Sequence, residues 1–375
     1  MDEQRFFDRL DSSAGDPSGL FEHFEQRSVR GRTYHALPDS RHGVERGTVV
    51  VDDADAIVRG YPSIPRILVL DPGIPSFFED HETVAVEEKL DGFNVRIADV
   101  GEPLAFTRGG YVCEYTTARA RDRLDLGEFF ASHPEKTLCA ELIGPETPYT
   151  THDYEGVDSH VFRIFGVRDR ESGEPLPVSE RRSLCEEFGL PQPQLFGRWD
   201  PRDAIEGVRR AISELDAGGR EGVIMKSADG REITKYTTGS QHHAELAFAF
   251  SLPFDLGQDF LFSRVIREGF QAAELDEDDD RIRERAHDLG ESILLPMVET
   301  IRDVEVDETV GEPHTVRGDP AAIDALLEHL REQSLTLEVE DDRREDGDRV
   351  VEFVKVAEST RDRIRYYLDG GTRDE

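Results

Sequence analysis

Apolar and polar residues alternate along much of residues 81–240, which is the pattern of strands that bury one face. The runs TVAVEEKL, FNVRIADV and HVFRIFGVRD show this pattern best, and Gly, Pro and Asp residues separate them. Helical patterns come between the strands at about 121–132, 179–188 and 201–215. This order of elements predicts an α+β domain built on a mostly antiparallel sheet, with polar side chains at the strand ends.

The pattern differs before this domain. Residues 1–80 combine a helical spacing of Phe6, Phe7 and Leu10 with the strand-like runs RTYHAL, GTVVV and RILVL, which predicts an N-terminal α+β unit. Two prolines in GYPSIPR (60–66) exclude the interior of a helix there. We expect this segment to form a fixed loop that leads into the next domain.

The pattern changes again after residue 240. Helical spacing dominates residues 241–305, where the long stretch 280–303 is interrupted by Pro296. Residues 306–375 show a strand, a helix, two strands joined by an acidic turn and a short terminal helix, which predicts a small C-terminal α/β module. The chain is therefore expected to have four parts.

The composition adds a strong charge imbalance. The chain has 45 Lys and Arg residues against 81 Asp and Glu, a net charge of −36 and an isoelectric point near 4.7. Like charges repel across a surface unless salt screens them, and at molar salt the screening length falls to roughly 3 Å. We expect a surface adapted to a salty, halophilic cytoplasm. The alternative is an ordinary acidic protein from a genome that favours arginine.

Neither a membrane span nor a disulfide framework is indicated. No apolar run approaches the roughly 18 residues that cross a bilayer, and the first residues lack the basic start and apolar core of a secretory signal. Cys113, Cys139 and Cys185 have no paired metal-ligand spacing. We expect a cytoplasmic protein with no membrane partner.

Lysine is rare in this chain. The lysines are Lys89, Lys136, Lys226, Lys235 and Lys355. A lysine becomes a nucleophile when burial or nearby positive charge lowers its pKa from about 10.4, whereas arginine stays protonated. Lys89 ends a predicted strand just before Asp91 and Gly92, where glycine lets the chain turn sharply. By itself, this K-x-D-G tetrapeptide also fits an exposed lysine before a turn.

Six short segments follow one another in a characteristic order. They are KLDGFNVR (89–96), FTRGG (106–110), CAELIG (139–144), VFRIFGVRD (161–169), REGVIMKS (220–227) and ITKYTT (233–238). Together they resemble the motifs of the covalent nucleotidyltransferase superfamily of ATP-dependent DNA ligases, RNA ligases and mRNA capping enzymes. The resemblance implies that residues 81–240 form the antiparallel-sheet catalytic domain of this superfamily, an ATP-grasp-like ligase domain.

The resemblance implies a chemical role for three of these residues. Lys89 would attack the α-phosphate of ATP, release pyrophosphate and carry AMP. Glu141 would lie near the ribose and a metal ion, and Glu221 mainly at the metal. Two carboxylates and a triphosphate suit Mg²⁺ or Mn²⁺. In so acidic a chain, either glutamate taken alone is equally well explained as a solvated strand residue.

Other matches concern the nucleotide. Phe165 would stack on the adenine ring, although Gly166 follows it where many relatives have an acidic residue. The alternative for Phe165 is a core position on an alternating strand. Arg96 and Arg108 would contact the ribose or phosphates, and the alternative for each is one more surface arginine.

The last two motifs contribute lysines. The resemblance implies that Lys226 and Lys235 neutralise the α-phosphate and lower the pKa of Lys89. Many relatives have two lysines spaced K-x-K in the last motif. This chain has Lys235, Tyr236 and Thr237 at these three positions. Either one lysine serves alone or an arginine such as Arg231 assists it.

The layout outside the catalytic domain distinguishes members of the superfamily. DNA ligases and capping enzymes usually continue into an OB barrel, and the helical and α/β patterns after residue 240 do not fit one. This layout resembles the archaeal ATP-dependent RNA ligase family. The resemblance implies a homodimer, with residues 241–305 as a dimerisation region. Its substrate would be a 5′-phosphorylated RNA end joined to a 3′-hydroxyl, with RNA circles as one product.

Some alternatives stay open at this point. Phosphate contacts dominate nucleic-acid affinity. A chain as acidic as this one therefore needs a local basic patch to bind RNA. Candidates are ARARDR (118–123) and RIRER (281–285), unless these arginines only balance acidic neighbours. The chain is also compatible with a DNA-joining or GTP-using relative, or with a nucleotide-binding regulator, although a regulator has no need of a nucleophilic lysine.

Overall fold

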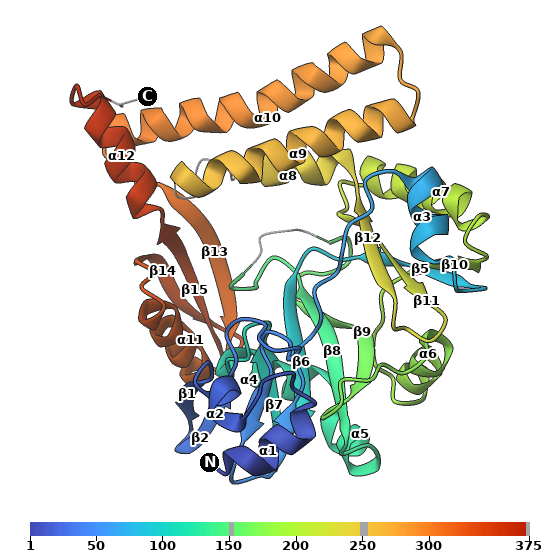
Figure 1. Ribbon diagram of the computed structural model, residues 1–375. Coiled ribbons are helices and arrows are strands. Elements are labelled where there is room, and N and C mark those ends of the chain that lie inside the picture. The colour runs from blue at the N-terminus through green and yellow to red at the C-terminus, as the bar shows by residue number, and fades with distance from the viewer. Residues whose placement is uncertain (150–153, 248–253, 373–375) are drawn as a thin grey trace.

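The computed structural model describes residues 1–149, 154–247 and 254–372, and Figure 1 shows how their helices and strands are arranged. The N-terminal unit contains an antiparallel sheet of β1 (Glu25–Val29), β2 (Arg32–Ala36), β3 (Val49–Val51) and β4 (Ala56–Val58), in that order. Helices α1 (Glu3–Leu10) and α2 (Pro17–Phe21) pack on this sheet. Each begins after an aspartate that accepts a backbone N–H, Asp2 for α1 and Asp16 for α2.

Two further antiparallel sheets form the central domain. One has the order β10-β5-β11-β12 and the other the order β7-β6-β8-β9. Their strands are β5 (Val84–Lys89), β6 (Phe93–Asp99), β7 (Pro103–Thr107), β8 (Lys136–Ile143), β9 (Val161–Asp169), β10 (Leu195–Trp199), β11 (Gly222–Ser227) and β12 (Ile233–Thr237). This arrangement confirms the predicted mixture of helices and antiparallel strands.

The chain passes from one sheet to the other directly after Lys89. Residues Leu90 to Gly92 make the crossing, and β6 begins at Phe93. A Cβ atom on Gly92 would lie 2.6 Å from the carbonyl oxygen of Leu142, so no larger residue fits at this crossing without a shift of the backbone. The crossing therefore holds Lys89 at the junction of the two sheets.

Helices cover both central sheets. They are α3 (Leu70–Phe77), α4 (Glu114–Arg123), α5 (Leu126–Ser132), α6 (Val178–Glu187) and α7 (Ala204–Ala217). The predicted strand RILVL (66–70) is wrong: within it only Arg66 forms a β-bridge, with Lys235. Leu70 already begins α3, whose first amides are satisfied because Glu274 Oε1 accepts the backbone N–H of Leu70 at 2.5 Å and of Asp71 at 3.2 Å.

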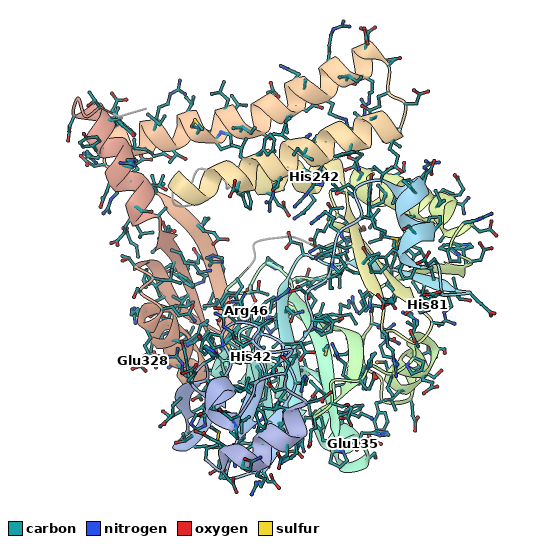
Figure 2. The ribbon with its side chains drawn as sticks, viewed as in Figure 1. His42, Arg46, His81, Glu135, His242 and Glu328 are labelled. Carbon is teal, nitrogen blue, oxygen red and sulfur yellow. The ribbon has the colours of Figure 1, made fainter. Side chains whose placement is uncertain are left out.

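Three helices follow the central domain. They are α8 (Gly239–Ala247), α9 (Phe254–Glu274) and α10 (Asp279–Glu305), and α9 and α10 form a long hairpin. His242 of α8 lies where this hairpin meets the central domain (Figure 2). The predicted interruption at Pro296 is wrong, because α10 continues through it and Thr300 donates to the Pro296 carbonyl at 2.8 Å. A proline removes one backbone hydrogen bond but need not end a long helix.

The C-terminal module has the predicted order of elements. Its strands β13 (Gly311–Gly318), β14 (Leu337–Glu345) and β15 (Asp348–Val356) form an antiparallel sheet in the order β13-β15-β14, with α11 (Pro320–Glu332) after β13 and α12 (Glu358–Leu368) at the end. Side chains of α11 pack with Tyr115 of α4 in one buried cluster. No helix within the described residues is long and apolar enough to cross a bilayer.

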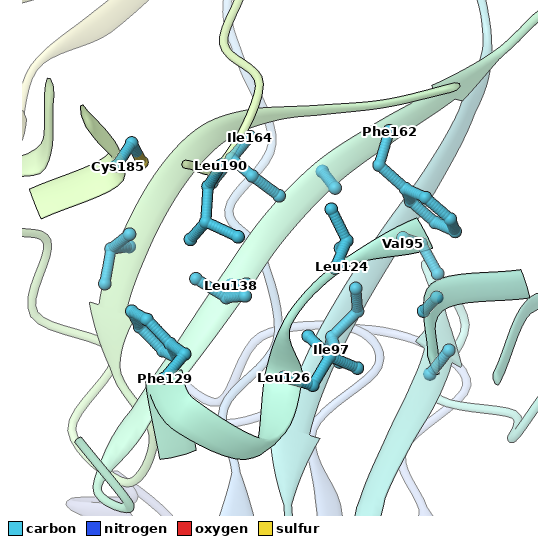
Figure 3. Close-up of a cluster of buried hydrophobic side chains, with 14 of the residues drawn as sticks. Val95, Ile97, Leu124, Leu126, Phe129, Leu138, Phe162, Ile164, Cys185 and Leu190 are labelled. Atoms are coloured by element: carbon cyan, nitrogen blue, oxygen red, sulfur yellow. The ribbon is translucent and has the colours of Figure 1, made fainter. Parts of the chain in front are cut away.

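The largest hydrophobic cluster lies under the sheet that contains β6 and β8. Phe129, Leu138, Phe162 and Ile164 fill its centre, and each is fully buried (Figure 3). Helices α4 and α5 close it from one side, and Cys185 of α6 packs at its edge. This core makes the sheet a rigid support for the polar side chains at its strand ends.

Arg96 of β6 joins the N-terminal unit to the central domain. Its side chain is 1% exposed, and it donates to the carbonyl oxygens of Arg59 at 2.7 Å, Gly47 at 2.7 Å and Thr107 at 3.0 Å. The predicted contact of Arg96 with the nucleotide is therefore wrong in this structure, since its guanidinium is buried away from the cavity and donates to backbone carbonyls. The N-terminal unit packs over this part of β6 and supplies two of the three acceptors.

We predict that Arg96→Met lowers the free energy of unfolding by about 3 kcal/mol, because buried carbonyls lose a charged donor. Denaturant unfolding in molar KCl measures this loss. The matched control is Arg41→Met, since Arg41 is exposed and its side chain donates only to Ser40 O at 3.1 Å. Its effect should stay within about 0.5 kcal/mol. Equal effects of the two substitutions would contradict the structural role of Arg96.

Candidate active site

A cavity opens where the ends of the two central sheets meet. It contains about 720 Å³ of space free of protein atoms, part of it open to solvent. Its lining residues are Tyr61, Ile64, Glu87, Glu88, Lys89, Leu90, Asn94, Arg108, Glu141, Phe165, Pro193, Ile224, Lys226 and Lys235. Six of the predicted site residues are among them, and a seventh, Glu221, contacts Lys89. Only Arg96 lies elsewhere.

The register of two neighbouring strands brings Lys89 and Glu221 together. Lys89 ends β5 opposite Gly222, the first residue of β11, and Glu221 directly precedes that glycine. Gly222 has a φ of +150°, and a Cβ atom there would lie 2.3 Å from the carbonyl oxygen of Tyr236. The result is a contact of 2.6 Å between Lys89 Nζ and Glu221 Oε2.

Carboxylates surround the amine of Lys89. Burial favours its neutral form, but Glu221, Glu141 and Asp91 outweigh burial and raise the pKa of Lys89. Lys235 and Lys89 repel each other, as expected, but this repulsion does not produce a net decrease in the pKa of Lys89 in the protein without nucleotide. Lys226 and Lys235 lie in the same cavity as Lys89, but the three carboxylates dominate.

Glu141 and Glu221 form a buried acidic pair. Burial raises the pKa of Glu141 to about 8, against the opposing effect of Lys89, and burial also raises the pKa of Glu221. Two carboxylates that cannot easily remain charged suit a divalent cation, which would stabilise their charged forms. The described residues contain no group of three or more possible metal ligands, so phosphate oxygens would have to complete the coordination of Mg²⁺ or Mn²⁺.

Asn94 is a site residue that the sequence analysis missed. It lies opposite Glu141 in the pairing of β6 with β8, and its side chain hydrogen-bonds to that carboxylate. The sequence contained a signal for it. Asn94 precedes the predicted site residue Arg96 by two positions on the same strand, so their side chains lie on one face of the sheet. Asn94 is near enough to the crossing to face the cavity, whereas Arg96 lies further along, under the N-terminal unit.

Lys226 is held by a second buried ion pair. Its Nζ lies 2.8 Å from Glu87 Oε2 and 2.7 Å from the carbonyl oxygen of Phe165. Glu87 also contacts Arg181 and, at 2.9 Å, Arg182. Burial opposes the charge of Glu87, but Lys226 and Arg181 lower its pKa to about 2. Sequence analysis missed Glu87, although its position two residues before Lys89 on a strand predicts the same face.

The apolar end of the cavity is built around Phe165. Its ring contacts that of Tyr61 edge to face, with centroids 5.3 Å apart. Ile64 and Ile224 complete this apolar wall. Tyr61 and Ile64 come from the GYPSIPR loop, so the predicted fixed loop supplies part of the cavity. A flat aromatic ring such as a nucleobase fits a slot of this kind.

Lys235 and Arg108 line the cavity, and no carboxylate in the described part of the chain lies within ion-pair distance of either. Burial, Arg66 and Lys89 together lower the pKa of Lys235 to about 8. The predicted assistance from Arg231 is wrong, because this residue is exposed in the turn after β11 and pairs with Glu174 at 2.8 Å. Arg66, which the sequence analysis did not consider, pairs with Lys235 in a β-bridge.

The two predicted basic patches are largely neutralised. In the first, Arg119 pairs with Asp122 at 3.1 Å and Arg121 with Glu102 at 2.6 Å. In the second, each arginine has an acidic partner, the pairs being Arg281 with Glu284, Arg283 with Asp280, and Arg285 with Glu268 and Glu277. These contacts support the alternative that these arginines balance acidic neighbours.

Two family models match this chain, and they cover different parts of it. Residues 82–237 match a family model described as RNA ligase, and residues 248–371 match one described as Ligase Pab1020 C-terminal region. The uncharacterized protein MJ0414 of Methanocaldococcus jannaschii is 39% identical over 340 residues, which are 88% of this chain and 85% of that protein.

Solved structures are similar to this chain over all or nearly all of its length. One described as an archaeal ATP-dependent RNA ligase, form 1, has a TM-score of 0.91 at 39% identity and covers 100% of both chains. Another, described as "Putative ATP-dependent DNA ligase from Aquifex aeolicus", has a TM-score of 0.86 at 26% identity over 94% of this chain and 97% of that one. The chain therefore belongs to the family of archaeal ATP-dependent RNA ligases, as its ordered motifs predict.

Proposed function

We propose that this protein is an ATP-dependent RNA ligase that works through a lysyl-AMP intermediate. The observation that carries the proposal is that Lys89 shares one cavity with an aromatic slot at Phe165 and with two further lysines, Lys226 and Lys235. An amine, a place for a nucleobase and cations for phosphates are the parts that nucleotidyl transfer needs. A regulator that only bound a nucleotide would need no amine at Lys89.

The proposed reaction has three transfers. The neutral amine of Lys89 attacks the α-phosphorus of ATP, a P–N bond forms, and the P–O bond to pyrophosphate breaks. A 5′-phosphate of RNA then attacks the same phosphorus, which frees Lys89 and gives a 5′-5′ pyrophosphate. A 3′-hydroxyl finally attacks the RNA 5′-phosphate, loses its proton and expels AMP. RNA circles form when both ends belong to one strand.

The chain's own groups prepare the first transfer. Lys89 must lose its proton, and Glu221 Oε2 is the nearest acceptor at 2.6 Å. We propose Mg²⁺, with Mn²⁺ as the alternative, at Glu141 and Glu221. The ion would neutralise both carboxylates and so favour the neutral amine. Glu87 keeps Lys226 in place behind the slot, which leaves Lys235 and Arg108 as the cations free to meet phosphate.

A DNA end is the second candidate substrate. The similarity to the Aquifex aeolicus protein, described as a DNA ligase, extends over nearly the whole chain. The RNA ligase is favoured because identity to the archaeal structure is higher, 39% against 26%, with full coverage. The two candidates share every step and differ only in the strand that carries the phosphate.

We further propose that the protein acts as a homodimer in a salty cytoplasm. Apolar side chains of the α9–α10 hairpin are exposed, with Phe262 65%, Leu294 58% and Leu295 55% accessible. Such exposure is typical of a surface that another molecule covers.

Light scattering in molar KCl should give twice the mass of one chain, and the double substitution Leu294→Glu and Leu295→Glu should reduce the mass to that of one chain. A single-chain mass for the unmodified protein would refute the dimer.

A labelling experiment tests the proposed intermediate. Protein incubated with α-labelled ATP and Mg²⁺ in molar KCl should acquire covalent label, and Lys89→Ala or Lys89→Arg should acquire none, because neither supplies a neutral amine. Lys136→Ala is the matched control, since Lys136 matches no motif and pairs with Glu135 at 3.4 Å. Equal labelling of the Lys89→Ala protein would refute the mechanism. Chelation of the metal should also abolish labelling.

The labelled enzyme then tests the substrate. Addition of 5′-phosphorylated RNA should discharge the label, whereas 5′-phosphorylated DNA of the same sequence should discharge it more slowly. RNA and DNA strands without the 5′-phosphate lack the attacking group, so neither should discharge the label. Discharge by DNA alone would replace the RNA ligase assignment with the DNA ligase.

The pKa of Lys235 gives a pH prediction. Its lowered value of about 8 means that the protein without nucleotide loses this charge as the pH rises from 7 to 9. If phosphate binds only the charged form, the affinity for α,β-methylene-ATP should fall about tenfold over this range. Lys235→Arg should reduce this pH dependence, because arginine stays charged, and the remainder comes from Glu141, whose pKa is also about 8. Calorimetry at constant salt measures both, and an unchanged pH profile in this variant would contradict the role of Lys235.

A further inference from the structure

Arg66 is a half-buried cation without an ion-pair partner among the described residues. No carboxylate within the described residues lies within ion-pair distance of it, and its Nη1 donates a hydrogen bond to Thr237 Oγ1. Most arginines of this acidic chain have such a partner. Burial lowers the pKa of Arg66 to about 10, and Arg267 contributes to the decrease. A half-buried guanidinium of this kind is costly unless an anion binds to it.

The backbone places Arg66 beside Lys235. The two residues form a parallel β-bridge, in which Lys235 N–H donates to Pro65 O and Ile67 N–H donates to Lys235 O, both at 3.1 Å. Paired residues on neighbouring strands project to the same face of a sheet. Two cations that have no carboxylate at ion-pair distance among the described residues therefore lie side by side. Lys235 lines the active-site cavity, and Arg66 lines a second, smaller pocket with Thr237 and His242.

A directed chain of hydrogen bonds holds Arg66 in this position. Glu268 accepts from His242 Nδ1, and burial lowers the pKa of His242, so the imidazole is neutral with its proton on Nδ1. His242 Nε2 is then an acceptor, and Thr237 Oγ1, at 2.8 Å, donates its proton to it. The lone pairs of that hydroxyl therefore face the Arg66 guanidinium, which can only donate.

The surroundings keep this arrangement in place. Arg285 pairs with the second oxygen of Glu268 and, through its other nitrogens, with Glu277. His243 Nε2 lies 3.9 Å from Glu268, and Gln271 Nε2 donates to the Thr237 carbonyl at 3.5 Å. Arg267 also faces Arg66, but it shares Glu245 with Arg264. Arg66 therefore remains the cation of this group without an acidic partner.

We propose that Arg66 binds a phosphate of the polyphosphate chain of ATP next to Lys235, and that His242 is a positioning residue which holds Arg66 through Thr237. This inference rests on the proposed function. It also accounts for the departure in the last motif: Thr237 stands where many relatives have their second lysine, and Arg66 places a guanidinium against that threonine. The missing cation comes from the GYPSIPR loop.

The first test is binding of pyrophosphate, measured by calorimetry in constant salt on protein that carries no AMP. Arg66→Ala should weaken it about tenfold or more, because a charge-assisted contact is lost. Arg66→Lys should restore part of it. Arg231→Ala, an exposed arginine paired with Glu174, is the matched control and should leave it unchanged. Unchanged binding in Arg66→Ala would overturn the proposal. This readout requires no turnover, so it stands apart from the labelling test of Lys89.

A second test distinguishes a contact of Arg66 with the phosphates of ATP from a contact with the 5′-phosphate of RNA. In single-turnover labelling, Arg66→Ala should raise the ATP concentration needed for half-maximal rate about tenfold. Wild-type and variant enzymes that already carry AMP should discharge to 5′-phosphorylated RNA at similar rates. The opposite result, slow discharge with normal use of ATP, would overturn the assignment to ATP and give Arg66 to the RNA end.

The positioning role of His242 has its own readout. His242→Ala should weaken pyrophosphate binding in the same direction as Arg66→Ala, and the double variant should be no weaker than Arg66→Ala alone, because both changes remove one contact. His242→Gln, which can still donate and accept, should restore binding in part. Additive losses would show that His242 does not act through Arg66. Circular dichroism and thermal melting of each variant establish that it is folded.

Discussion

The site depends on the ion pair between Lys89 and Glu221, which the register of β5 and β11 forms within one sheet. The chain then crosses to the second central sheet at Gly92, where a larger residue does not fit without a shift of the backbone. The crossing at Gly92 ends β5 at Lys89 and starts β6 in front of β8. It thereby brings residues of both sheets to one cavity. Buried charges of both signs can then interact over short distances in a low-dielectric environment, which is the condition for large pKa shifts.

The cavity distributes charge unevenly along its length. At the end lined by Phe165, Glu87 and its cations neutralise one another and hold these side chains in place. Around Lys89, carboxylates prevail and keep the amine protonated until something else takes their charge. Near Lys235 and Arg66, positive charge prevails. A molecule that brings a metal ion to one of these regions and phosphates to the other would relieve both imbalances at once.

Much of this site could be predicted from the sequence, because short motifs in a fixed order imply strands in a fixed register. Six predicted residues line one cavity for that reason, and the helical and antiparallel elements were also foreseen. What failed depends on long-range packing. Arg96 faces the N-terminal unit, Arg231 lies in an outer turn, and Arg66 lies beside Lys235 only because the GYPSIPR loop pairs with β12. No local pattern encodes which distant segment covers a strand.

The docking of α9 has a consequence for the order in which the protein can be made. Glu274 of α9 caps the first amides of α3, and Glu268 and Arg285 complete the chain of hydrogen bonds that ends at Arg66. All motif residues have left the ribosome well before this segment emerges. The surroundings of Arg66 therefore take their final form late in synthesis, after the strands that carry the motifs have emerged.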